Sequence, residues 1–156
     1  MSEGAKDAPG VVAPPPLIYA AGLLLGLALD SLFPIAVLPD MAQYVAGLVL
    51  IGAGILIAIS VLRRFKRAGT NLDVRKPTTA IVTTGPFRYS RNPAYVALSL
   101  LYAGIGIAAD SPWVLGLLIP ILVVMHFGVI LREERYLERK FGEDYLRYKH
   151  SIRRWL

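Results

Sequence analysis

The sequence has no cysteine and only two histidines among its 156 residues. Without cysteine the chain has no disulfide bond, no thiol nucleophile and no thiolate metal ligand, and we predict no metal site. Charged residues are also scarce, at 18% of the chain, whereas hydrophobic residues make up 55%. So little polar sequence cannot cover several long apolar segments in water. The composition is typical of an integral membrane protein.

Four apolar runs determine the expected fold. They cover residues 17–33, 41–62, 94–109 and 112–131, and each approaches the ~20 residues needed to cross a hydrocarbon core about 30 Å thick. We therefore predict an all-α, polytopic membrane helix bundle of about four transmembrane helices, followed by a cytoplasmic C-terminal helix at 132–150. The first and third runs are the least certain to span, so a half-inserted or re-entrant segment is the alternative.

The N-terminal residues 1–16 are rich in proline and precede a single predicted domain at 17–156. We expect this segment to be a disordered tail that runs extended into the first helix. It does not resemble a signal peptide, because Lys6 is its only basic residue and Glu3 and Asp7 offset that charge.

Basic residues occur before the first apolar run, in the loop 63–93, and after the fourth run. The opposite turns, 34–40 and 110–112, contain aspartate but no basic residue. Because lysine and arginine stay on the cytoplasmic side, both termini and the loop 63–93 are predicted to be cytoplasmic, in a bacterial inner membrane or its equivalent. The net charge of +6 follows from this topology and favours membrane lipids as partners. No nucleic-acid-binding module accompanies it, and these patterns do not specify an oligomeric state.

Small residues recur within the first two runs. Gly22 and Gly26 form a GxxxG pair, and Gly47 and Gly54 share a helix face with Ala58 one turn later. Glycine lets helix backbones approach closely in a membrane, so we predict that these residues pack helices together.

Polar side chains recur on one face of each of the last two runs. Tyr95, Ser99 and Tyr102 are spaced by four and three residues, and His126 and Glu133 are seven apart. For Ser99 and Tyr102 a structural role, as an interface anchor or an interhelical hydrogen bond, is favoured over a functional one. An unsatisfied imidazole inside a bilayer would be costly, so a functional role for His126 stays open.

Two dense polar clusters lie at residues 79–95 and 132–149, and the predicted topology places both at the cytoplasmic ends of the last two spans. In the first cluster Gly85 and Pro86 predict a turn, and Pro93 can open a helix with Asn92 as its cap. Acidic residues of the second cluster have basic neighbours at helical spacing, so a solvated helix face is the structural alternative to a binding site.

The order T-x-G-P-F-R-Y-x-R-N-P-x-Y, a membrane hairpin, and then E-E-x-x-L-x-x-x-F-G-x-x-Y-x-x-Y resembles a known superfamily. These motifs are similar to those of the isoprenylcysteine carboxyl methyltransferases and phospholipid methyltransferases, which are integral membrane enzymes. The resemblance covers residues 70–152. The first two apolar runs resemble the superfamily only in being apolar helices.

This resemblance implies S-adenosylmethionine as methyl donor and S-adenosylhomocysteine as product, in a pocket built from the hairpin and the C-terminal helix. No Rossmann glycine fingerprint is present, which fits such a pocket. A carboxylate suits the cationic amino group or the ribose hydroxyls of this cofactor, and aromatic rings suit its adenine or sulfonium. Carried over by position, the cofactor contacts are Thr79, Ala80, Ile81, Val82, Phe87, Asn92, Pro93, Tyr95 and Glu133.

The resemblance is weaker for the methyl acceptor. Prenylcysteine enzymes typically carry the sequence R-H-P, whereas this chain has Asn92 in place of the histidine. An arginine that is associated with the substrate in those enzymes corresponds to Val129 in this chain. Arg132, one turn away, is a candidate substitute, and His126 and Glu134 are candidate bases if the acceptor must lose a proton.

The predicted function is therefore S-adenosylmethionine-dependent methyl transfer to a lipophilic acceptor at the cytoplasmic membrane interface. That acceptor is an isoprenylcysteine-like carboxylate, a phospholipid amine or another small lipid. The alternative is a non-catalytic membrane scaffold whose polar clusters bind anionic lipid.

Overall fold

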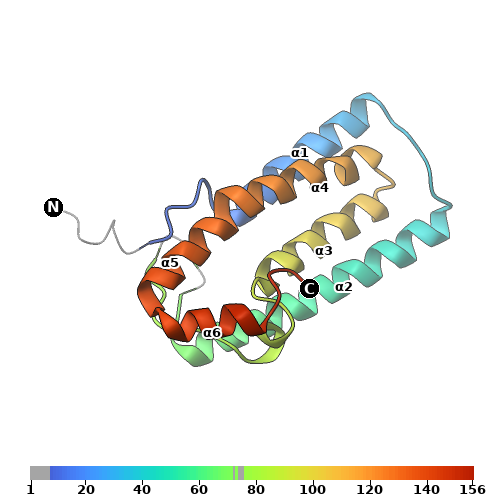
Figure 1. Cartoon of the computed structure of the whole chain (residues 1–156). Helices are drawn as coiled ribbons and strands as arrows, with labels where there is room; N and C mark the ends of the chain where they lie inside the picture. Colours follow the sequence, from blue (N-terminus) through green and yellow to red (C-terminus); the bar gives the residue numbers. More distant parts are fainter. Residues whose placement is uncertain (1–7, 72, 74–75) are drawn as a thin grey trace.

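The computed structural model describes residues 8–71, 73 and 76–156. All regular secondary structure in this described part is helical, and it contains no strands (Figure 1). The last apolar run and the start of the second polar cluster form one continuous helix made of α4, η2 and α5. The helices are α1 (Pro15–Leu32), α2 (Asp40–Ala68), the 3-10 turn η1 (Gly85–Arg88), α3 (Pro93–Ala108), α4 (Pro112–Val124), the π-helical η2 (Met125–Ile130), α5 (Leu131–Phe141) and α6 (Glu143–Ser151).

The prediction of a helical membrane bundle is confirmed. Three helices of the described chain are long and apolar enough to cross a membrane, namely α1, α2 from Met41 onward, and the continuous helix Pro112–Phe141. Helix α3 is apolar but has only 16 residues. At 1.5 Å per residue it extends over about 24 Å, which is shorter than the ~30 Å hydrocarbon core. The third predicted span is therefore a short helix of the bundle.

Helix α2 continues six residues past the predicted boundary at 62 and ends at Ala68. A helix needs apolar residues only inside the bilayer, so the basic residues that follow do not stop it. Lys66 and Arg67 lie in its last turn, where positive charge favours the carbonyl end of a helix. Gly69 then adopts a left-handed conformation with φ 62° and ends the helix.

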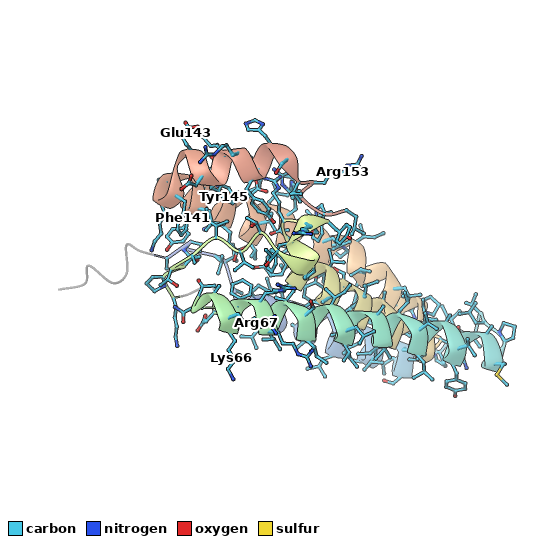
Figure 2. All side chains as sticks on the ribbon, turned by 90° about the horizontal axis from the view of Figure 1, so that it is seen from below. Lys66, Arg67, Phe141, Glu143, Tyr145 and Arg153 are labelled. Carbon is cyan, nitrogen blue, oxygen red and sulfur yellow. The ribbon has the colours of Figure 1, made fainter. Side chains whose placement is uncertain are left out.

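The prediction of a single C-terminal helix at 132–150 is wrong, because the helix is interrupted at Gly142. This glycine has φ 53° and ψ −128°, a conformation that side chains with a Cβ rarely adopt. Helix α5 continues the last span, and α6 turns back along the end of the bundle (Figure 1). Tyr145 lies on the side of α6 that faces the bundle, whereas Glu143 points outward (Figure 2).

Glycines bring the helix backbones close together, as the sequence predicts. Helices α2 and α3 make the most extensive contact of the bundle. A Cβ placed on Gly47 would lie 2.8 Å from the Gly104 carbonyl oxygen, and one on Gly54 would lie 3.0 Å from the Ala97 carbonyl oxygen. Helices α1 and α4 meet in the same way, since a Cβ on Gly26 would lie 2.8 Å from the Cα of Val114.

The polar face of α3 joins α1 through a hydrogen bond. The hydroxyls of Tyr19 and Ser99 lie 2.8 Å apart, and Ser99 also donates to the Tyr95 carbonyl at 2.8 Å. Tyr102 packs edge-on against Tyr19 with ring centroids 6.0 Å apart. Ser99 therefore forms an interhelical hydrogen bond, whereas the buried Tyr102 hydroxyl has no hydrogen-bond partner within the described part of the chain and only the Tyr102 ring packs against α1.

The two acidic turns meet at the end of the bundle away from the polar clusters. The Asp110 carboxylate accepts hydrogen bonds from the backbone N–H groups of Val37, at 2.7 Å, and Leu38, at 3.1 Å. The Trp113 indole donates to the Phe33 carbonyl at 2.8 Å. The loop after α1 is thereby fastened to the turn between α3 and α4.

Residues 1–7 of the predicted N-terminal tail lie outside the described part of the chain. Residues 8–14 have no regular secondary structure but pack onto the long final helix. The Val12 N–H donates to the Gly128 carbonyl at 3.2 Å. Helix α1 begins at Pro15, two residues earlier than predicted, because proline fits the first turn of a helix.

We expect Gly47→Ala to lower the free energy of unfolding by about 1–3 kcal/mol, because the new methyl group overlaps backbone atoms of α3. Gly52→Ala is the matched control on the same helix, since a Cβ at Gly52 meets no atom within 4 Å. Thermal unfolding in detergent should show a lower Tm for Gly47→Ala alone. Equal Tm values for the two variants would contradict this packing.

Candidate active site

The two polar clusters meet at a cavity of about 620 Å³. The cavity lies among the C-terminal half of α2, the start of α3, α5, α6 and the loop before η1, next to the first residues of α1. The hairpin of α3 and α4 returns the chain to the same end of the bundle, so residues 79–95 and 132–149 lie together there (Figure 1). Apolar side chains form most of its wall, including Ala58, Leu62, Leu98 and Leu101.

Most of the predicted site residues line this one cavity. They come from the loop between α2 and α3, from η1 and the start of α3, and from α5. A volume of this size falls within the ~300–1,000 Å³ typical of small-molecule sites. The predicted residues on its wall are Ala80, Ile81, Val82, Phe87, Asn92, Pro93, Tyr95, Glu133 and Glu134.

Thr79 is not among the residues that line the cavity, but it anchors the segment that does. Its backbone N–H donates to the Thr70 hydroxyl at 3.1 Å, and its own hydroxyl donates to the Gly69 carbonyl at 3.0 Å. The backbone N–H of the preceding residue, Thr78, donates to the Tyr136 hydroxyl of α5 at 3.2 Å. The chain that leads into residues 80–82 is thereby fixed between α2 and α5.

His126 and Arg132 also lie away from the cavity wall. His126 is in the π-helical segment, where its ring packs edge-on against Phe127 with centroids 4.8 Å apart. Arg132 is exposed and donates from Nη1 to the Gly10 carbonyl at 2.8 Å. The structure therefore does not bring these two predicted catalytic residues to the cofactor residues.

Glu133 is the carboxylate that the continuous final helix presents to the cavity. The Tyr95 hydroxyl donates to Glu133 Oε1 at 2.7 Å, which links the start of α3 to α5. Tyr95 is buried and Glu133 is partly buried. The hydrogen bond orients the carboxylate, which can accept hydrogen bonds from an ammonium group or from hydroxyl groups of a ligand.

The adjacent Glu134 is buried and binds three cations. Arg154 donates to its two oxygens from Nε and Nη2, at 2.8 and 2.9 Å. Arg91 Nη2 lies 3.2 Å from Oε1, and Lys149 Nζ lies 3.9 Å from Oε2. The hydrogen bond with Glu134 raises the pKa of Arg154. A carboxylate occupied in this way joins segments of the chain and is poorly placed to act as a base.

The C-terminal segment also pairs with the start of α3 through backbone atoms. The Arg91 N–H donates to the Arg153 carbonyl at 2.9 Å, and the Asn92 side chain donates to the Arg154 carbonyl at 2.9 Å. Asn92 holds the N-cap position of α3, but its side chain makes no cap hydrogen bond. The predicted capping role is therefore wrong, because the Asn92 side-chain amide donates to the Arg154 carbonyl instead.

Two tyrosines of α6 close the cavity from the side of the C-terminus. The Tyr148 hydroxyl donates to the Phe87 carbonyl at 2.8 Å. Burial raises the pKa of Tyr148 to about 12, against a smaller opposing effect of Arg91, and burial also raises the pKa of Tyr145 well above its usual value. Both side chains are therefore neutral at physiological pH and offer aromatic faces to the cavity.

Sequence reasoning missed several residues of this site. Arg91, Tyr145 and Tyr148 line the cavity, and Arg154 holds Glu134. The tyrosines were visible as part of the F-G-x-x-Y-x-x-Y pattern, whose spacing of three places both on one face of α6. Nothing in the local sequence marked Arg154, because its partner lies 20 residues earlier across a helix break.

Comparison with known proteins identifies a family and a relative. The family model for phospholipid methyltransferase matches residues 42–144, which include most of α2 and all of α3, α4 and α5. Over 42 residues the chain is 60% identical to an uncharacterized protein of Haemophilus influenzae. That segment is 27% of this chain and spans 65% of the relative's length.

We expect Glu134→Gln to lower the free energy of unfolding by about 3–5 kcal/mol, because it leaves the buried Arg91 and the partly exposed Arg154 without their counter-charge. Asp144→Asn is the matched control. Asp144 pairs with Arg147 on the outer side of α6, where both side chains are more than 70% exposed, and its loss should cost less than about 1 kcal/mol. Thermal unfolding of both variants checks this difference, and a Glu134→Gln variant as stable as the control would contradict it.

Proposed function

The chain belongs to the phospholipid methyltransferase family, and from this premise we propose that it transfers a methyl group from S-adenosylmethionine to a lipophilic acceptor at the cytoplasmic membrane interface. The family makes it a membrane methyltransferase. The observation that carries the finer proposal is the single cavity lined both by an oriented carboxylate, Glu133, and by lipid-side apolar residues.

The polar end of the cavity suits the cofactor. Glu133 offers a carboxylate to its ammonium group or ribose hydroxyls, and the Tyr95 hydroxyl fixes that carboxylate. Phe87 and Tyr145 offer aromatic faces to adenine or the sulfonium. Residues 80–82 line the same wall. We assign the cofactor contacts to these residues, with Asn92 and Pro93 at the start of α3. We assign Thr79 the role of holding residues 80–82 in place.

The apolar end of the cavity suits a lipophilic acceptor. Leu62 of α2 lines the cavity and keeps 50% of its surface exposed, so the cavity wall reaches the outer face of the bundle. Ala58 lies one turn away from Leu62, beyond the glycines that hold α2 against α3. We propose that the acceptor enters between α2 and α3 from the membrane, so that only its reacting group reaches the polar end.

When bound, the cofactor supplies an electrophilic methyl group, whose bond to sulfur breaks as the bond to the acceptor forms. The protein side chains bind and align the two reactants, and such alignment lowers the barrier without covalent help. The apolar wall excludes water from the site. We assign Glu134 a positioning role. We assign no role in proton transfer to His126 or Arg132, since neither residue lines the cavity.

The acceptor is proposed only as a class: a carboxylate, an amine or another nucleophile carried by a lipid. Val129, where prenylcysteine enzymes have a substrate-associated arginine, is fully buried in the core. No cation at that position is available to hold a prenylcysteine carboxylate. This departure favours acceptors other than prenylcysteine, and the family name favours a phospholipid.

The orientation follows from charge. Lys66 and Arg67 lie at the same end of the molecule as α6 and the cavity (Figure 2). The opposite end carries Asp110 and its partner loop. Because basic residues stay on the cytoplasmic side, we propose that the cavity and both termini face the cytoplasm.

We expect Glu133→Gln to weaken S-adenosylhomocysteine binding by about 10- to 100-fold, since a hydrogen bond to a charged group is worth about 1.5–3 kcal/mol. Isothermal titration of the full chain in detergent measures this. Glu143→Gln is the matched control, because Glu143 lies on the outer side of α6 and not on the cavity wall. A folded wild-type protein that binds no cofactor would favour a non-catalytic scaffold instead. A Glu133→Gln variant that binds it normally would contradict the role assigned to Glu133.

A further inference from the structure

Arg91 is a buried cation that is only partly paired. Its side chain is 8% exposed, and Nη2 lies 3.2 Å from Glu134 Oε1. Its Nε and Nη1 atoms are also buried, and they have no hydrogen-bond partner within the described part of the chain. Arg91 lines the cavity. Two donor nitrogens of a guanidinium next to the proposed cofactor residues therefore lack a partner.

Unpaired donors of this kind are costly unless a ligand uses them. A buried polar group without a partner costs about 1–3 kcal/mol, and more when it is charged. Carboxylate and phosphate oxygens are the strongest acceptors for guanidinium N–H groups. Because Nε and Nη1 donate on different edges of the guanidinium plane, an anionic oxygen group of a ligand would accept from one of them and a second acceptor from the other.

The surroundings hold Arg91 in place and leave its charge incompletely balanced. Its backbone N–H donates to the Arg153 carbonyl at 2.9 Å, which fixes the main chain against the C-terminal segment. Its acidic partner, Glu134, also binds Arg154 through both oxygens. Lys149 lies 3.9 Å from Glu134 but pairs closely with Glu138. Glu134 thus balances two arginines, and an additional anion at Arg91 is favoured.

We propose that Arg91 binds an anionic oxygen group, a carboxylate or a phosphate, of a ligand in the cavity. This inference rests on the proposed function and specifies which part of the ligand this side chain recognises. The carboxylate of an α-amino acid group fits best, because Glu133, the neighbour of Glu134, lines the same cavity and offers a carboxylate to the ammonium group. The amino acid end of the methyl donor has this chemistry, and so does the phosphate of a phospholipid acceptor.

Titration of the full chain with two cofactor analogues separates these sources. S-Adenosylhomocysteine carries the amino acid group, whereas 5′-methylthioadenosine has the same adenosine and thioether without it. If Arg91 binds the carboxylate, Arg91→Lys weakens S-adenosylhomocysteine binding by about 10-fold or more and changes 5′-methylthioadenosine binding by less than about 2-fold. Arg91→Gln, which keeps donors but removes the charge, gives the same pattern and serves if Arg91→Lys does not fold.

Arg154→Lys is the matched control. Arg154 binds the same carboxylate of Glu134 but is not among the residues that line the cavity. A purely structural role of Arg91 would make Arg91→Lys and Arg154→Lys weaken both analogues equally. The proposed role changes the ratio of the two affinities only in Arg91→Lys.

A second arm tests the phosphate source with dihexanoyl phosphatidylethanolamine and dihexanoylglycerol, which differ in the phosphate-bearing headgroup. A loss confined to the phospholipid in Arg91→Lys assigns Arg91 to the acceptor phosphate and supports the inference. Unchanged affinity ratios in both arms overturn it. A wild-type protein that binds neither adenosine compound contradicts the proposed function instead, and the lipid arm then decides the role of Arg91 alone.

Discussion

The buried carboxylate of Glu134 is the interaction on which the functional end of the molecule depends. It joins α5 to Arg91 before α3, to Lys149 of α6 and to Arg154 in the C-terminal segment. Arg91 and the segments that carry Glu134 and Tyr145 line the cavity. Because the carboxylate is desolvated, its removal would leave the buried Arg91 without a counter-charge. The adjacent Glu133 is thereby held on the cavity wall, where it is free to meet a ligand.

The membrane part of the bundle supplies the other constraint. Gly47, Gly54 and Gly104 bring α2 and α3 to backbone contact, and the cavity wall on α2 begins one turn beyond Gly54, at Ala58. The first turn of α3 carries Tyr95, which bonds to Glu133 of α5. Tight packing at one end and a cavity at the other are thus consequences of the same pair of helices. A site with a polar end and a lipid-side apolar end follows from this geometry.

Much of the fold could be predicted, because hydrophobic length and glycine spacing act locally along each helix. The helical bundle and the packing role of Gly22, Gly26, Gly47 and Gly54 are confirmed. Helix ends were harder to predict, since α2 continues through basic residues that hydropathy alone excludes. The break at Gly142 depends on the contacts that α6 makes with the bundle, which no local pattern contains.

The residues of the candidate site that belong to a sequence motif could be predicted. The residues that are held there by long-range pairs were missed. Motif positions such as Phe87 and Glu133 line the cavity. The pairing of Arg154 with Glu134 and the unpartnered Nε and Nη1 of Arg91 arise only when the C-terminal segment folds back on the start of α3. The local sequence does not show them. His126 was predicted from a seven-residue spacing to Glu133, but the π-helical segment between them changes the register of the helix and turns His126 toward Phe127.

The most direct test of lipid methylation is incubation of the purified full chain with methyl-labelled S-adenosylmethionine and a total lipid extract of the native membrane. We expect the label to pass into the organic phase and to remain attached to one lipid class. Label recovered only in a soluble small molecule would contradict entry of the acceptor from the membrane. The absence of any transferred label, in a preparation that binds the cofactor, would contradict methyl transfer to lipid.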